Sequence, residues 1–166
     1  MATRNHTGNA PLRMLERLMV MEFDAEEACR IAIDHLADPR YRDQLTAFRA
    51  DYQRHLHELE PAIRQLGGKP PNKPDLRGRL EEGKVLFAQL GGDDAILKAI
   101  RTNAEQLVHA YEQALGQVPA TALEVATRNR DDQRQHLDWL NATIKAMETA
   151  PHRGVPPWNI PPPSGF

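Results

Sequence analysis

Proline and glycine concentrate in a few stretches of this 166-residue sequence, and their spacing most limits how the chain can fold. These stretches are residues 66–80, 90–94, 116–119 and the segment after Pro151. Between them the chain is rich in Ala, Leu, Glu, Arg and Gln, which are good helix formers. Alternating runs of Val, Ile and Thr, which are typical of strands, do not occur. The sequence therefore predicts an all-α fold.

The uninterrupted stretches predict four long helices, over residues 11–36, 40–66, 93–115 and 120–150. The first and last links between them are short. The middle link is long, and its residues 76–90 predict a short amphipathic helix. This is the connectivity of an up-down four-helix bundle with one crossover. We expect one bundle domain over 1–150 and an extended proline-rich arm over 151–166, because proline forbids a helix there.

Composition excludes several classes of protein. The net charge is only −2, so nothing indicates a nucleic-acid partner. The single cysteine, Cys29, excludes an intramolecular disulfide framework and a cysteine-based zinc finger. No apolar run reaches the ~18–20 residues of a membrane span, and residues 1–13 lack the apolar stretch of a secretory signal. The expectation is a cytoplasmic protein with no membrane contact.

Two glutamates interrupt the apolar face of the first helix. Leu15, Met19 and Cys29 recur at helical spacing, and Glu22 and Glu26 fall in the same stripe, one turn apart. A carboxylate buried alone costs several kcal/mol unless it is paired, hydrogen-bonded or bound to metal. The stripe therefore predicts a polar centre inside the bundle.

The two halves of the chain resemble each other. "DAEEACRIAIDHL" resembles "NAEQLVHAYEQAL" (103–115), and "DYQRHLHEL" (51–59) resembles "DDQRQHLDWL" (131–140). This alignment matches Glu26 with Glu105 and His55 with His136. Two similar helical hairpins related by a pseudo-twofold axis would bring all four helices around one centre.

Helical periodicity indicates which of these groups face inward. His55 fills a place in the second helix's apolar stripe, between Tyr52 and Leu59. His136 lies about 50° from the centre of the last helix's stripe, at 100° per residue. Glu105 lies at the edge of the third stripe. We therefore expect His55 and His136 inside the bundle.

Two interpretations of the polar centre remain open on this reasoning. A divalent or trivalent metal would offset the burial of the carboxylates and their mutual repulsion, and imidazole with carboxylate suits iron, manganese or zinc. Alternatively, Glu22 and Glu26 pair with a histidine or with Arg30, or one is protonated and bound to a tyrosine. A rotated helix would instead place them in water or at a dimer seam.

Four segments carry a family resemblance: "DAEEACRIAIDHLADPRYRDQL", "LHELEPAIRQLGGKP", "LGGDDAILKAI" and "NAEQLVHAYEQAL". They resemble a bacterial ferritin-like family of unknown function, over about residues 10–148. The resemblance implies a ferritin-like four-helix fold. In metal-binding branches of that superfamily, the first and third helices each supply a Glu, and the second and fourth each supply a Glu-x-x-His pair.

Carried over residue by residue, the resemblance implies the following ligands. Glu22 or Glu26 takes the place on the first helix, Glu105 that on the third, and His55 and His136 the two histidine places.

The chain departs from the Glu-x-x-His pattern three residues before each histidine, where Tyr52 and Gln133 stand. Asp51 and Asp132 lie four residues before them. The resemblance therefore implies one metal more readily than a ferroxidase-type pair.

Two functions follow as expectations. The first is a ferritin-like metal-binding protein that holds iron, or else manganese or zinc, in the bundle core. It would store, sense or oxidise iron, or respond to oxygen or peroxide stress. The second is a metal-free bundle that acts by homodimerisation or by binding a partner protein. Hydrolase and transferase signatures, such as a glycine-rich phosphate loop or a G-x-S-x-G elbow, do not occur.

Overall fold

The computed structural model describes residues 10–73 and 89–150, which form four helices with no strand among them. The helices are α1 (Ala10–His35), α2 (Pro39–Gln65), α4 (Gly92–Leu115) and α5 (Ala120–Thr149). The all-α prediction is confirmed, and the helix bounds agree with the predicted ones to within a residue. The short helix predicted within 76–90 and the arm predicted at 151–166 lie outside the described residues.

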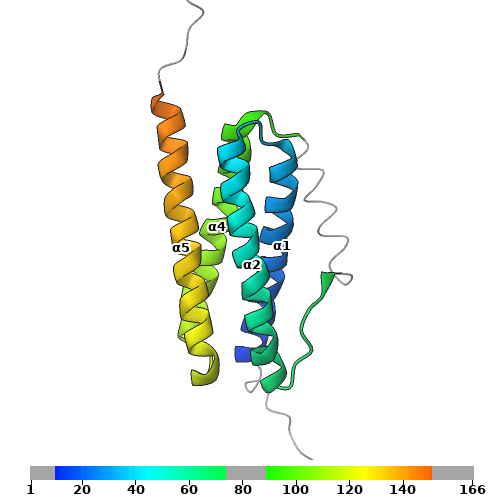
Figure 1. Ribbon diagram of the computed structural model, residues 1–166. Coiled ribbons are helices and arrows are strands. Elements are labelled where there is room, and N and C mark those ends of the chain that lie inside the picture. The colour runs from blue at the N-terminus through cyan, green and yellow to red at the C-terminus, as the bar shows by residue number, and fades with distance from the viewer. Residues whose placement is uncertain (1–9, 74–88, 151–166) are drawn as a thin grey trace, which may run out of the picture.

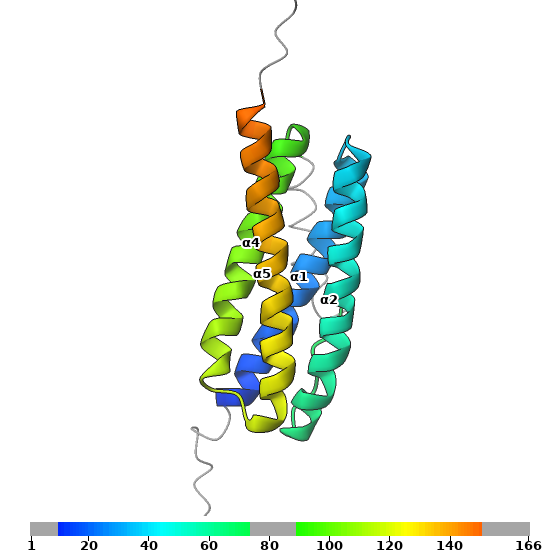
Figure 2. The same ribbon diagram turned by 60° about the vertical axis from the view of Figure 1, so that its left-hand side comes forward.

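The helices form two antiparallel hairpins (Figure 1). The chain turns sharply between α1 and α2, and again between α4 and α5. α2 ends at one end of the bundle and α4 begins at the other, so these two helices run in the same direction. Figure 2 shows the α1–α2 hairpin beside the α4–α5 hairpin. The common direction of α2 and α4 agrees with the predicted up-down order with one crossover, whose residues 74–88 lie outside the described part of the chain.

Aspartates tie one end of the bundle together. Asp38 is the N-cap of α2, and its Oδ1 accepts a hydrogen bond of 2.8 Å from the backbone nitrogen of Arg40. Asp93, in the first turn of α4, accepts backbone hydrogen bonds of 2.8 and 2.9 Å from Ala37 and Asp38. The start of α4 is therefore held directly against the α1–α2 turn.

Two glycines allow α2 to end close to α1. Gly67 has φ of 77°, the left-handed conformation that commonly ends a helix. A Cβ atom at Gly68 would collide with the side chain of Leu12. The absence of a side chain at residue 68 therefore lets Leu12 of α1 pack closely against the end of α2.

The predicted inward faces form the core. Leu45, Phe48, Tyr52 and Leu59 of α2 are buried, and His55 lies among them with no exposed surface. On α5, the inward face includes His136. Buried polar residues in the described part of the chain are Glu22, Glu26, Glu27, His55, Asn129, Gln133 and His136. The helical register therefore places a polar layer within an otherwise apolar bundle.

Candidate metal centre

Glu22 lies at the centre of the polar layer. Its Oε1 atom accepts a hydrogen bond of 2.6 Å from the hydroxyl of Tyr111 on α4. The same atom lies 3.1 Å from Nδ1 of His55 on α2 and 3.4 Å from Nε2 of Gln133 on α5. All four side chains are fully buried. Every helix of the bundle thus contributes one polar group around a single carboxyl oxygen.

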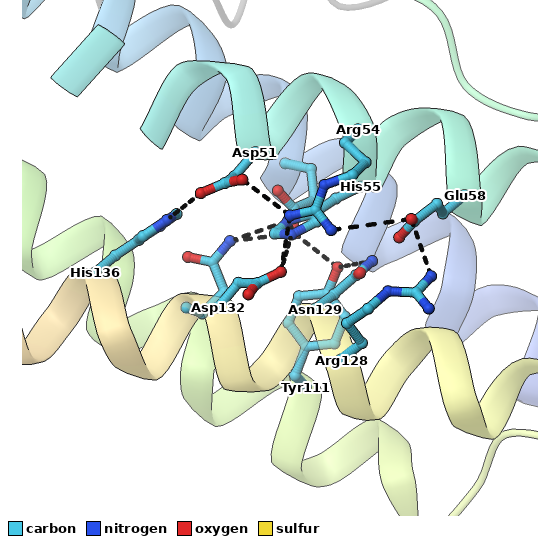
Figure 3. Close-up of polar contacts among 11 residues, drawn as sticks. Asp51, Arg54, His55, Glu58, Tyr111, Arg128, Asn129, Asp132 and His136 are labelled. Carbon is cyan, nitrogen blue, oxygen red and sulfur yellow. Dashed lines mark hydrogen bonds and ion pairs between the residues drawn. The ribbon is translucent and has the colours of Figure 1, made fainter. Parts of the chain in front are cut away.

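His55 joins this inner group to the outer part of the network. Its Nε2 atom lies 3.2 Å from Oδ2 of Asp132 on α5, so each ring nitrogen faces a carboxyl oxygen (Figure 3). Burial by itself lowers the pKa of His55, but the hydrogen bond to Glu22 and then the one to Asp132 outweigh burial and hold the pKa above its ordinary value. The surroundings therefore favour a positive charge on the imidazole.

Arg54 bridges two aspartates at the outer side of the network. Its Nη2 atom donates hydrogen bonds of 2.9 Å to Asp51 Oδ1 and 2.8 Å to Asp132 Oδ2 (Figure 3). The second oxygen of Asp51 lies 2.9 Å from Nε2 of His136. His136 also stacks on Phe48, with 3.9 Å between ring centroids. An acid–imidazole chain thus runs from Glu22 through His55 and Asp132 to Asp51 and His136.

The two histidines of this chain have opposite protonation tendencies. Burial lowers the pKa of His136 below its ordinary value, against the hydrogen bond to Asp51 that raises it. The pKa of Asp132 is raised by burial, but hydrogen bonds from Arg54 and His55 outweigh this and lower it overall. Relative to a free imidazole, the surroundings therefore favour the neutral form of His136 and the charged form of His55, and they favour the ionised form of Asp132.

Several buried polar atoms of this network have no partner within the described residues. They are Oε2 of Glu22, Oε1 of Gln133 and Nδ1 of His136. Leaving a buried polar group unpaired costs about 1–3 kcal/mol. The two oxygens are acceptors without a donor among the described residues, on side chains whose other polar atoms approach His55, so the hydrogen bonding of this part of the network is incomplete.

Glu26 has different surroundings, although it lies one turn from Glu22 and only 1% of its side chain is exposed. Oε1 accepts hydrogen bonds of 2.7 Å from Arg49 and 3.1 Å from Gln53, and Oε2 accepts one from Lys73. Burial raises the pKa of Glu26, but these bonds outweigh it and the pKa falls below its ordinary value. The structure therefore does not bring Glu26 to the histidines.

Glu105 is also outside the polar layer. Its side chain is 52% exposed, and it lies 3.6 Å from Arg101 on the same helix. The internal repeat aligned Glu105 with Glu26, yet only Glu26 is buried. The inward polar group that α4 supplies is the phenol of Tyr111.

The predicted ligands therefore divide into two sets. Glu22, His55, Asp132, Asp51 and His136 are joined in one network, whereas Glu26 and Glu105 are not part of it. In their present arrangement, no three His, Cys, Asp or Glu side chains in 10–73 and 89–150 form a group that could hold a metal ion. These side chains are instead joined in pairs, through histidine protons and the Arg54 guanidinium.

The sequence did not predict Arg54 as part of the site. Gln133 was placed in the inward stripe of the last helix and at the position of a missing glutamate, but it was not predicted to be a ligand. The signal for Arg54 was its place three residues after Asp51, since residues at this spacing are neighbours on a helix surface. Gln133 could have been found as a neutral amide inside an apolar stripe.

Part of the chain matches a known protein family. Residues 10–117 match a family described as a domain of unknown function, DUF2383. The chain belongs to this family. The DUF2383 match includes Glu22, His55 and Tyr111, but it ends before α5, so Gln133, Asp132 and His136 lie outside it. A comparison with curated proteins finds no match.

None of the four described helices combines the length and the apolar character needed to cross a bilayer. The predictions of a cytoplasmic location and of a homodimer stay predictions.

Proposed function

We propose that this DUF2383 protein has a ferritin-like fold and binds one divalent transition-metal ion, iron foremost and manganese or zinc as alternatives. Glu22, His55 and Gln133 are its ligands in this proposal. The main support is the pair of buried oxygens without a hydrogen-bond donor among the described residues, Glu22 Oε2 and Gln133 Oε1, on two side chains that both approach Nδ1 of His55.

The spacing of the polar atoms supports this assignment. Glu22 Oε1, His55 Nδ1 and Gln133 Nε2 form a triangle with sides of 3.1, 3.4 and 3.4 Å. Rotating the Gln133 amide by half a turn presents its oxygen to this triangle instead of its nitrogen. The point equidistant from the three corners is about 2 Å from each, which is close to the roughly 2.0–2.2 Å of metal bonds to nitrogen and oxygen. Gln133 would be a neutral ligand in this set, beside the carboxylate of Glu22 and the imidazole of His55.

Charge balance supports a divalent ion. The network of Figure 3 and its centre contain four carboxyl groups, on Glu22, Asp51, Glu58 and Asp132. Within the described residues, the guanidinium groups that pair with them are those of Arg54 and Arg128. With all four acids ionised, acids exceed guanidinium groups by two charges. A charged His55 reduces this excess to one in the metal-free protein, and the excess returns to two when His55 gives up its Nδ1 proton to bind metal.

The neighbouring groups suit a ligand role for His55. A histidine that binds metal through one nitrogen usually donates the other N–H to a carboxylate, which fixes its orientation. Asp132 is placed to accept that bond from Nε2. The Tyr111 hydroxyl holds Glu22 in the same way, and burial keeps the pKa of Tyr111 well above its ordinary value, so it remains a donor. Metal binding would replace only the Nδ1 proton of His55.

A redox-active ion such as iron, when bound, would supply one-electron chemistry with oxygen or peroxide. The chain's own contribution is a dry, pre-oriented set of one carboxylate, one imidazole and one amide. With such an ion bound, the protein would act in iron handling or in the response to oxygen-related stress.

Anaerobic titration of metal-free protein with Fe²⁺, and with Co²⁺ as a probe that absorbs visible light, tests the proposal. The wild type is expected to bind one ion per chain. His55→Gln is expected to bind at least about 100-fold more weakly, because loss of even an outer-shell partner costs 10–100-fold. His109→Gln is the matched control, since His109 is exposed on α4. Absence of binding by the wild type, or equal binding by His55→Gln, would overturn the proposal.

A further inference from the structure

A cleft lies between the α1–α2 hairpin and the segment that follows α2. The chain turns back along the hairpin after α2, and residues 69–73, here called the strap, follow this turn (Figure 1). Residues 69–72 form one wall of the cleft, and side chains of α1 and α2 form the other. Its volume of about 420 Å³ falls within the roughly 300–1,000 Å³ of small-molecule sites.

We propose that this cleft binds a small amphipathic anion, which has a hydrocarbon body and one carboxylate. The proposal does not rest on the metal-binding function, because the cleft shares no lining residue with the Glu22–His55–Gln133 set.

The apolar part of the lining suits the hydrocarbon body. Met19 and Phe23 of α1 and Leu56 of α2 belong to the core and also line the cleft. Pro70 and Pro71 of the strap line it from the opposite side. Methionine adapts its flexible side chain to differently shaped apolar groups. A hydrocarbon between these two walls would be removed from water, which is the main favourable term for its binding.

The charges of the lining suit the carboxylate. Two cations, Arg64 and Lys69, line the cleft with one acid, Glu60. Glu60 already accepts hydrogen bonds of 2.7 and 3.1 Å from Arg64. No carboxylate of the described chain lies within ion-pair distance of Lys69. Lys69 is therefore the cation of this cleft whose charge an anionic ligand can neutralise.

The strap is held in place at both of its ends. Before it, Gly68 packs so closely against Leu12 of α1 that a Cβ atom would collide there. At its other end, Lys73 donates a hydrogen bond to the buried carboxylate of Glu26. The two prolines of the strap also restrict its backbone. The wall is therefore formed before a ligand arrives, and binding does not have to order it.

Titration of the full chain with decanoate, with a chelator present, tests the proposal. Amide-resolved NMR is expected to show saturable shifts at Phe23, His57 and Lys69, and none along α5. Decylammonium has the same hydrocarbon length and the opposite charge, and it is expected to bind at least about tenfold more weakly. Absence of saturable binding by decanoate, or equal binding of the two ligands, would overturn the proposal.

A charge reversal locates the anion. Lys69→Glu is expected to weaken decanoate binding about tenfold, because it removes an attraction and adds a repulsion. Lys145→Glu is the matched control, since Lys145 is also exposed but lies on α5, and its affinity is expected to equal that of the wild type. Equal affinity in Lys69→Glu and the wild type would contradict the proposal.

Circular dichroism checks that Lys69→Glu is folded. Lys69→Gln, which removes the charge without reversing it, is expected to fold and to show an intermediate loss of decanoate affinity. An unchanged affinity in Lys69→Gln together with a full loss in an unfolded Lys69→Glu would count against the proposal.

The outcomes for the two proposed sites are separate. Decanoate binding by a chain that binds no metal would support the cleft and reject the metal-binding function. Metal binding by a chain that does not bind decanoate would have the opposite meaning.

Discussion

Glu22 and Glu26 are the same residue type, one turn apart on α1, and both are buried. Glu26 is neutralised by Arg49 and Lys73, whose side chains are partly exposed and reach in from the surface. Glu22 contacts an imidazole, a phenol and an amide, all buried, and one of its oxygens has no partner in the described chain. A buried carboxylate can thus be held either by permanent charges of the chain or by groups that leave room for an exchangeable cation.

This difference separates a structural role from a binding role. Lys73 lies beyond the end of α2, so its bond to Glu26 fastens the segment after α2 to α1. Glu22 fastens no surface segment. The comparison can be tested by changing the two residues in the same way.

The largest expected effect is on metal affinity. Glu22→Gln is expected to weaken Co²⁺ or Fe²⁺ binding at least about 100-fold, because it removes the only charged ligand of the proposed site. Glu26→Gln is expected to leave the affinity within a few-fold of the wild type. Equilibrium titration against a competing chelator measures both affinities. Equal losses in the two variants would contradict a binding role for Glu22 that Glu26 does not share.

Stability of the metal-free protein should show the reverse order. Glu26→Gln is expected to lower the free energy of unfolding by about 1–3 kcal/mol, because it leaves two cations without their buried partner. Glu22→Gln is expected to cost less, since an amide oxygen still accepts the Tyr111 hydrogen bond. Urea denaturation with chelator present provides the measurement. A larger loss in Glu22→Gln would contradict the structural role of Glu26.

A smaller gain is expected from Gln133→Glu. This change replaces a neutral ligand of the proposed site by a carboxylate and should raise affinity for a divalent ion by about tenfold, or 1.4 kcal/mol. Gln135→Glu, on the exposed side of α5, is the matched control and should have no effect. Unchanged affinity in Gln133→Glu would exclude this residue as a ligand.

The smallest expected effect is the pH dependence of the contribution that Glu26 makes to the free energy of unfolding. The folded protein holds the pKa of Glu26 below its ordinary value of 4.5, so ionised Glu26 stabilises the fold above pH 4.5 and the contribution is lost as pH falls through the lower folded pKa. The stability difference between wild type and Glu26→Gln is therefore expected to shrink below pH 4.5. Paired denaturation curves across pH 3–7 measure it, and a constant difference would contradict the assignment.

Much of the fold could be predicted from local patterns. Proline and glycine mark the helix ends because they interrupt the backbone hydrogen bonding of a helix, and the described helices end there. His55 could be placed inside because Tyr52 and Leu59 define its face, and it is fully buried. The site was predicted only in part, because partners such as Lys73 for Glu26 lie far away in the chain.

The internal repeat shows why a sequence pattern can place a side chain on the wrong side of a helix. It matched Glu26 with Glu105, but a repeat in sequence sets only the position of a residue along its helix. The rotation of each helix about its own axis decides which side faces the core. In α4 that rotation turns Tyr111 inward and leaves Glu105 exposed.

The order of residues alone determined that this chain makes four amphipathic helices with acids and histidines in their apolar stripes, because helical periodicity is a local property. Only the tertiary structure decided which of these groups meet. Long side chains such as those of Arg54 and Lys73 reach across helices. The packing of the hairpins pairs Glu26 with cations of the chain and leaves one oxygen of Glu22 without a partner among the described residues.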